Sequence, residues 1–205
     1  MNTPATTIRK SISGVDAQTR ILDAVDDLFY REGARAVGVD AVVKAAGVNK
    51  MSLYRQFESK DALLMHYLER SDARFWSYFD ASVAKHPGNP KAQLQQFFDD
   101  LTPRICRPGY RGCPFVNIAA EFPDPDHPTR KRVAENKRQL MTRLEAMAAQ
   151  AGAHDPHQLA AGLALLIEGA YAGSQTYAPG NDMLPTVPAV AAALIEGACR
   201  PAAAA

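Results

Sequence analysis

The chain has 205 residues, of which 47% are hydrophobic and 22% charged, and its formal net charge is +1. This composition is typical of a globular protein with a substantial core and excludes a wholly disordered chain. The near-neutral charge does not by itself indicate a nucleic-acid partner, so any basic surface would have to be local. The longest apolar run in the C-terminal half, from Leu159 to Ile167, covers nine residues. A membrane-spanning helix needs about 20, so we expect no membrane association.

The N-terminus is polar and lacks the apolar segment of a secretory signal. We expect residues 1–14 to form a disordered arm. The three cysteines, Cys106, Cys113 and Cys199, are odd in number and show no metal-type spacing. A reducing cytoplasm is their simplest location.

Helical spacing of apolar residues begins near Asp16, with Ile21, Val25 and Leu28 on one face, and Gly33 ends it. Shorter helices are predicted over residues 39–46 and 50–57, and a long one from residue 59. The later chain predicts helices over residues 93–105, 114–122, 128–152, 156–175 and 188–199, and Asp126 is the predicted N-cap of the third of these. Strand-like alternation is absent from the sequence, so the predicted fold class is all-α with about nine helices.

The stretch "AAGVNKMSLYRQFESKDALL", residues 45–64, changes character several times within a short length. Gly47 suits a helix C-terminus that needs positive φ, and Asn49 suits the N-cap of a following helix. This pattern of helix, tight turn and helix predicts a helix-turn-helix, whose second helix enters the major groove of DNA. Spacing directs Leu53 and Phe57 inward. It directs four residues outward: Lys50, Met51, Tyr54 and Arg55.

Residues 44–60 also carry a local charge of +3, from Lys44, Lys50, Arg55 and Lys60 against Glu58. Phosphates attract such a patch whatever the base sequence. On spacing alone, an amphipathic helical hairpin with ordinary solvated lysines explains the stretch about as well.

Residues 19–64 closely resemble the DNA-binding domain of the TetR family of bacterial transcriptional regulators. The resemblance includes the A-G-V turn, the L-Y-x-x-F recognition helix and the S-K-x-x-L-L start of the fourth helix. It implies an N-terminal three-helix DNA-binding domain, residues 15–62, and a C-terminal helical ligand-binding and dimerisation domain, residues 63–205. One departure is Gly38, where the family usually has Thr or Ser capping the second helix.

The resemblance also implies roles for particular residues. Lys50, Met51 and Ser52 become candidates for base edges, whereas Tyr54 and Lys60 become phosphate contacts. Ser59 would lie beside the DNA backbone, and Arg55 could contact either part of the DNA. The predicted DNA-binding set is Lys44, Asn49, Lys50, Met51, Ser52, Tyr54, Arg55 and Lys60.

The expected partners are double-stranded operator DNA, a second copy of the chain and a small-molecule effector. The helix from Pro156 is apolar on almost every side, which indicates burial or a partner. We predict that it forms a homodimer interface with the final helix, although an ordinary core helix pair is the alternative. The predicted interface residues are Gly162, Leu166, Gly169, Gly173 and Leu194.

A pocket for a small hydrophobic or aromatic effector is expected among the fourth to eighth helices, although any single aromatic residue there is more often core. Asn117 and Glu121, four residues apart, could orient the ligand. The predicted ligand-binding residues are Phe75, Phe79, Phe98, Phe115, Asn117, Glu121 and Tyr171. The function predicted from all of this is a homodimeric repressor that the effector releases from its operator, with no cofactor.

Cys113 supports two alternatives. It precedes a predicted helix N-terminus and has Arg107 and Arg111 nearby, which favours a thiolate and would suit a redox or electrophile sensor. Packing as a small residue is the simpler interpretation. Cys113, Asn117 and His127 are also the residue types that a cysteine hydrolase uses in catalysis, but no family signature surrounds them.

Two further interpretations concern metal binding and overall class. The chain could be a helical interaction module that does not bind DNA. No metal site is predicted, because two acidic and histidine-containing clusters suit loops and helix caps better. Those clusters are Asp124, Asp126 and His127, and His154, Asp155 and His157.

Overall fold

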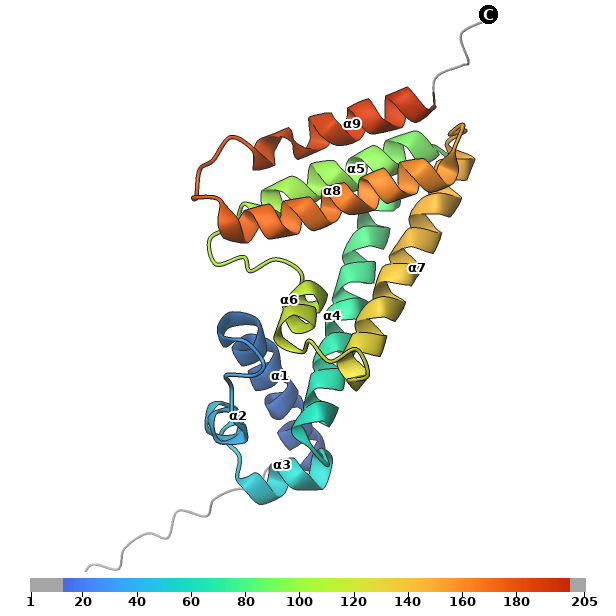
Figure 1. Cartoon of the computed structure of the whole chain (residues 1–205). Coiled ribbons are helices and arrows are strands. Elements are labelled where there is room, and N and C mark those ends of the chain that lie inside the picture. The colour runs from blue at the N-terminus through green and yellow to red at the C-terminus, as the bar shows by residue number, and fades with distance from the viewer. Residues whose placement is uncertain (1–12, 200–205) are drawn as a thin grey trace, which may run out of the picture. The chain divides into compact units, whose positions relative to one another are not determined.

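The computed structural model describes residues 13–199, and Figure 1 shows their arrangement. Within this range the structure contains nine α-helices, one 3-10 helix and no strand, which confirms the predicted all-α class. Residues 1–12 of the predicted arm lie outside the described residues. The helices are α1 Gly14–Glu32, α2 Val39–Ala46, α3 Lys50–Gln56, α4 Lys60–Val83, α5 Pro90–Ile105, α6 Pro114–Glu121, α7 Pro128–Gln150, α8 Pro156–Thr176, the 3-10 helix Leu184–Thr186 and α9 Val187–Ala198.

The chain divides into two compact units, Met1–Tyr67 and Leu68–Ala205. The sequence-based boundary lay at residues 62 and 63, a few positions earlier. Helix α4 is continuous across the division, so its first eight residues belong to the first unit and the remainder to the second.

In the first unit, α1 packs against α2 and α3. The helix begins at Ser13, whose side chain accepts a hydrogen bond from the Asp16 amide at 3.1 Å. The apolar stripe of α1 is buried, and Ile21 and Val25 have no exposed surface. Phe29 meets Tyr67 of α4 edge to face, with ring centroids 5.7 Å apart. This contact holds the first part of α4 against α1.

The core of the second unit centres on aromatic side chains of α4 and α5. Phe79, Phe97 and Phe98 are almost completely buried. The rings of Phe79 and Phe97 lie 4.8 Å apart, and Phe75 completes the cluster at 6.2 Å from Phe97. Burying one such ring contributes about 2 kcal/mol or more to stability.

Helix α7 lies beside the part of α4 that belongs to the second unit (Figure 1), and polar side chains join the two helices. The carboxylate of Asp72 on α4 accepts from Arg132 at 2.5 Å and from Asn136 at 2.7 Å. Asn136 is buried, and the Asp72 and Arg132 side chains are only 14% and 15% exposed. Because removing one partner would leave a charge with little access to water, this connection should be costly to break.

The N-terminus of α7 differs from the sequence prediction. Its N-cap is His127, whose Nδ1 accepts from the Thr129 amide at 3.3 Å. The predicted cap, Asp126, lies one residue earlier, in a turn where the carboxylate of Asp124 accepts from the Asp126 amide at 3.0 Å. Prediction favoured Asp126 because aspartate is the commoner cap, but the turn places the imidazole at the helix end.

Candidate functional site

The turn between α2 and α3 has the predicted geometry. Gly47 lies at φ 64° and ψ 32°, the left-handed region that favours glycine. Its N–H donates to the carbonyls of Val43 and Lys44, and the next amide, of Val48, donates to Val43 at 3.1 Å. These bonds satisfy the last carbonyls of α2 within a tight turn. The role predicted for Gly47 is therefore confirmed.

Helix α3 begins as predicted at Asn49, whose side-chain oxygen accepts from the Ser52 amide at 2.8 Å. Leu53 and Phe57 are 0% and 2% exposed. Phe57 also packs edge to face on His66 of α4, with centroids 5.4 Å apart. One side of this short helix is thus fixed in the core.

The opposite side of α3 is open to solvent. Met51 is 67% exposed and Tyr54 is 53% exposed, which is unusual for such large apolar or aromatic side chains. Lys50 and Arg55 are exposed on the same helix, and Lys44 is exposed in the last turn of α2. The outward direction predicted for the α3 residues is confirmed.

An ion pair that the sequence did not reveal joins α2 to α3. The ammonium of Lys50 lies 2.7 Å from the carboxylate of Asp40. The hydrogen bond that Lys50 donates to Asp40, and then the negative charge of Asp40, raise the pKa of Lys50 above its ordinary value. Asp40 is thus a close partner of a predicted base-contacting residue. The available sequence signal was weak, because ten positions separate the two residues.

The last predicted DNA-contacting residue, Lys60, lies at the start of α4. Its ammonium donates to the backbone carbonyl of Arg35 at 3.3 Å. Ser59 accepts from the Ala62 amide at 3.1 Å and so caps the helix. Helix α2 has no such cap, because its N-cap is Gly38, which offers no side chain. The start of α4, with Ser59 and Lys60, therefore belongs to the same compact unit as α3.

Most of the predicted ligand-binding residues lie in the core of the second unit. Phe79, Phe98, Phe115 and Tyr171 are buried, and Phe75 is half-buried. Burial raises the pKa of the Tyr171 hydroxyl well above its ordinary value.

Asn117 and Glu121 are both half-buried on α6. Asn117 holds neighbouring segments together, because it donates to the Arg111 carbonyl at 2.7 Å and accepts from Gln175 at 3.2 Å. Whether these residues contact an effector stays a prediction.

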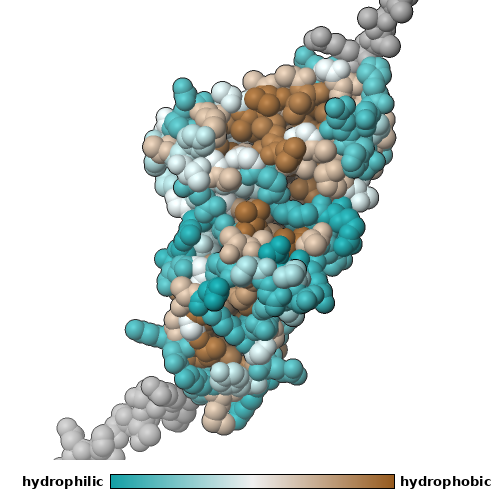
Figure 2. Space-filling view, viewed as in Figure 1, coloured by the Kyte–Doolittle hydropathy of each residue, from teal (hydrophilic) through white to brown (hydrophobic). Residues whose placement is uncertain are grey.

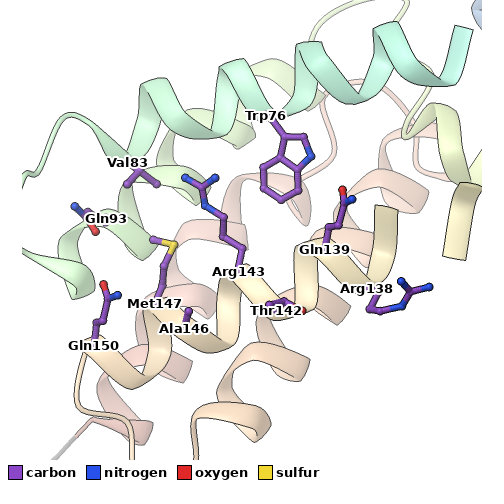
Figure 3. Close-up of a pocket in the computed structure, with 10 residues that line it drawn as sticks. All are labelled: Trp76, Val83, Gln93, Arg138, Gln139, Thr142, Arg143, Ala146, Met147 and Gln150. Atoms are coloured by element: carbon purple, nitrogen blue, oxygen red, sulfur yellow. The ribbon is translucent and has the colours of Figure 1, made fainter. Parts of the chain in front are cut away.

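An open groove of about 640 Å³ lies elsewhere in the second unit, between α4, α5 and α7 (Figure 3). Trp76 and Val83 come from α4, and Arg143 rises from α7 toward them in the figure. The seven predicted ligand-binding residues do not line it. Sequence patterns offered little indication of this groove, because half of its ten lining residues are polar residues spread along α7.

Helices α8 and α9 pack together and expose apolar side chains. Leu165 is 72% exposed, Val190 is 42% exposed and Leu194 is 37% exposed. Figure 2 shows hydrophobic residues gathered over this part of the surface. We call this surface, with Gly169, the α8–α9 face.

The predicted interface residues differ in how exposed they are and in what they contact within their own chain. Gly169 is exposed and Leu166 half-buried. Gly162 lies against Leu194 within the chain, since a Cβ built there would be 3.7 Å from that side chain. Gly173 is buried, and a Cβ there would come within 2.8 Å of Met183. Gly173 thus packs inside its own chain.

The Cys113 thiol is 8% exposed at the N-terminus of α6. The cation at the thiol is Lys137, whose ammonium lies 3.6 Å from Sγ and 2.5 Å from the Glu168 carboxylate. Lys137 was not among the cations that the sequence suggested, and the proximity of Arg107 and Arg111 to the thiol stays a prediction. The other two residues of the hydrolase alternative are engaged elsewhere, Asn117 as above and His127 at the α7 cap.

Metal binding and membrane insertion bear on the broad class of the protein. Across residues 13–199, no three His, Cys, Asp or Glu side chains are grouped to hold a metal ion. None of the helices in that range is both long enough and apolar enough to cross a bilayer.

The geometry of the first unit defines a helix-turn-helix protein, and α3 is the second helix of the motif, which in proteins of this class enters the major groove. Comparison with known families agrees. A family model described as bacterial regulatory proteins, tetR family, matches residues 21–67. A second, described as tetracyclin repressor-like, C-terminal domain, matches residues 90–183.

Individual relatives extend this result. The transcriptional regulator AcuR of Cereibacter sphaeroides is 30% identical over 147 residues, which cover 68% of this chain and 67% of AcuR. An uncharacterized HTH-type transcriptional regulator of Mycobacterium tuberculosis, Rv1255c, is 40% identical over 58 residues, and the match spans 28% of this chain and only 29% of that relative.

Among solved structures, SCO4454, a TetR-family transcriptional regulator from Streptomyces coelicolor, superimposes with a TM-score of 0.85 at 28% identity. The alignment covers 91% of this chain and 97% of that structure. The chain belongs to the TetR family and is a DNA-binding transcriptional regulator.

Proposed function

We propose that the protein is a homodimeric cytoplasmic repressor without enzymatic activity, which a small hydrophobic or aromatic effector releases from its operator. The observation that carries the proposal is the two-sided character of α3. Leu53 and Phe57 fix one side in the core, while Met51 and Tyr54 stand exposed on the other. A helix held this way has a fixed backbone, so binding DNA would cost side-chain rotamer entropy but little backbone entropy.

The DNA contacts follow from side-chain chemistry. We assign base-edge contacts to Lys50, Met51 and Ser52 at the start of α3, since the N-terminal residues of a recognition helix make such contacts. Tyr54 combines an exposed ring with a polar tip that can donate to a phosphate. Lys50 must leave Asp40 in order to contact DNA, so the ion pair competes with the operator.

The α8–α9 face supports a dimer. A contiguous exposed apolar surface commonly marks an interface with a partner. A second copy of the chain would cover this face. It would also supply the second recognition helix, so that the two helices could contact DNA half-sites about 34–36 Å apart. Gly169 would lie where two such faces meet, and the absence of a side chain allows close helix approach.

Helix α4 offers a route from effector to DNA, because one continuous helix takes part in both units. In the second unit, Asp72 ties it to Arg132 and Asn136 of α7. An effector that displaces α4 relative to α7 would alter the segment that begins at Ser59. For release, the effector must bind the DNA-free arrangement better than the DNA-bound one.

The DNA-binding assignment is tested by selecting bound fragments from genomic DNA and measuring variants on the selected operator. Loss of a base contact in Lys50→Ala should weaken binding by about 1–3 kcal/mol and relax sequence preference. Loss of a phosphate contact in Tyr54→Ala should flatten the dependence of log K on log salt by about one unit. Lys131→Ala, at an exposed position of α7, is the control and should bind normally. Unchanged binding by both α3 variants would refute the assignment.

The dimer is tested by Gly169→Leu, because a Cβ at this exposed position meets nothing within 4 Å in its own chain. The variant should fold, sediment as a monomer and bind the operator more weakly, since only one half-site is engaged. Ala134→Leu, at an exposed position of α7, should remain dimeric. A dimeric Gly169→Leu protein with normal operator affinity would place the interface elsewhere.

A further inference from the structure

The groove between α4, α5 and α7 has the size of a small-molecule site. Its volume of about 640 Å³ falls within the roughly 300–1,000 Å³ typical of ligand pockets. The α7 residues that line it extend from Arg138 to Gln150, with Gln93 of α5 near the second end (Figure 3). An elongated molecule lying along α7 would fit this shape.

The lining of the groove combines an apolar wall with positive charge. Trp76, Val83 and Met147 supply apolar surface, and Arg138 and Arg143 supply two cations. The other polar lining residues are neutral amides and one hydroxyl, and no carboxylate lines the groove. A neutral apolar ligand would leave Arg138 without a complementary charge among the lining residues, whereas Arg143 already pairs with Asp80 of α4. A cation would be repelled.

Arg143 is held in position within this wall. Its guanidinium lies over the rings of Trp76 and Phe79, at 5.4 Å and 5.1 Å from their centroids. Its Nη2 also pairs with the carboxylate of Asp80 on α4. A guanidinium carries five N–H donors, so this one pairing leaves others for a ligand. The stacked position limits the side-chain entropy that binding would cost.

We propose that this groove binds an organic anion with a flat aromatic body. The ring would pack against Trp76 and the aliphatic side chains, while a carboxylate or sulfonate would meet Arg143 or Arg138. Arginine suits this role because its planar donors match the geometry of such anions. The groove thereby defines a chemical class of effector that the buried aromatic core did not indicate.

The consequence for regulation rests on the proposed function. An anion bound at Arg143 competes with Asp80 for the same guanidinium and so weakens one of the connections between α7 and α4. Because α4 continues into the DNA-binding unit, this exchange is a direct means for the effector to change the position of that helix. The Asp72 connection lies nearer the start of α4 and does not line the groove.

The site is testable on the DNA-free full-length chain, because Trp76 is the only tryptophan in the sequence and lines the groove. The probe is anilinonaphthalene sulfonate, which becomes fluorescent on binding and accepts excitation energy from tryptophan. Its matched control is N-phenylnaphthylamine, the same aromatic body without the sulfonate. The variants are Arg138→Gln, at an exposed position, and Arg143→Gln. Lys131→Gln, outside the groove on α7, controls for loss of one charge.

We expect energy transfer from Trp76 to the sulfonate probe in the wild-type chain. Each arginine variant should weaken its binding about five- to tenfold, as charge-assisted contacts at a partly exposed site allow, and Lys131→Gln should not. The neutral probe should bind more weakly and equally to all four proteins. Equal affinities of the two probes, or unchanged sulfonate binding by Arg138→Gln in a chain of normal helicity, would overturn the proposal. Release of the protein from its operator by the sulfonate probe is measured separately. If the probe binds but does not release the protein, the proposed effector response is contradicted, whereas the anion site is still supported.

Discussion

The loop before α6 offers a sharp test of backbone geometry, because two of its glycines share a left-handed backbone but differ in their surroundings. Gly109 and Gly112 have φ of 76° and 66°, so both occupy the left-handed region. A Cβ at Gly109 would meet nothing within 4 Å. A Cβ at Gly112 would lie 2.4 Å from Nε2 of Gln175 and 3.0 Å from the backbone oxygen of Tyr171.

These contacts set the size of the expected effects. Gly109→Ala should cost only the strain of a side chain at positive φ, about 1 kcal/mol. Gly112→Ala carries the same strain, displaces Gln175 from its 3.2 Å hydrogen bond to Asn117, and presses on a backbone carbonyl that cannot move freely. Adding a lost hydrogen bond and local strain gives about 2–3 kcal/mol in total. The corresponding decreases in Tm are about 3 °C for Gly109→Ala and about 8 °C for Gly112→Ala.

Trp76 fluorescence is a suitable assay, since the single tryptophan lies in the same unit as the loop. Urea and thermal unfolding would be compared for wild type, each alanine variant and Gln175→Ala with and without Gly112→Ala. Removing Gln175 should recover part of the Gly112→Ala loss, because the nearest obstructing atom is then absent. Equal destabilisation by Gly109→Ala and Gly112→Ala would refute the role assigned to Gln175 and Tyr171.

Three other predictions concern charge and thiol chemistry. Asp40→Asn should strengthen operator binding about two- to fivefold, because it frees Lys50 and removes a negative charge near the phosphates; unchanged or weaker binding in a gel-shift would contradict this. Burial and the negative charge of Asp100 raise the pKa of Tyr78 to about 12, although Arg104 opposes them. The folded state therefore binds the Tyr78 proton more tightly than the unfolded state does. The resulting contribution to the free energy of unfolding is complete below about pH 10 and is lost as pH rises toward 12. Tyr78→Phe should flatten that alkaline decline in urea unfolding, and an unchanged pH profile would argue against it. Cys113→Ser should keep operator affinity and effector response if the thiol only packs; peroxide-triggered release of wild type that the variant lacks would instead establish a sensor.

The local elements of the DNA-binding unit could be predicted because their causes lie within a few residues. Gly47 ends α2 through its own backbone freedom, and Asn49 starts α3 through a bond to an amide three positions later. Inward Leu53 and Phe57 follow from helical spacing. The misplaced cap of α7, assigned to Asp126 in place of His127, shows the limit of such reasoning, since the preceding turn places the less common capping residue at the helix end.

The sequence by itself therefore determined the all-α class, the order of the helices and the outward side of α3, because each depends on periodicity and on short-range hydrogen bonds. Only the tertiary structure decided which distant side chains meet. It paired Lys50 with Asp40, set Lys137 beside Cys113, and joined Arg143 to Asp80 across 63 positions of chain. The same is true of the groove, whose walls come from three helices. Such contacts depend on how helices pack against one another, and helical periodicity specifies which face of a helix is buried but not which helix covers it.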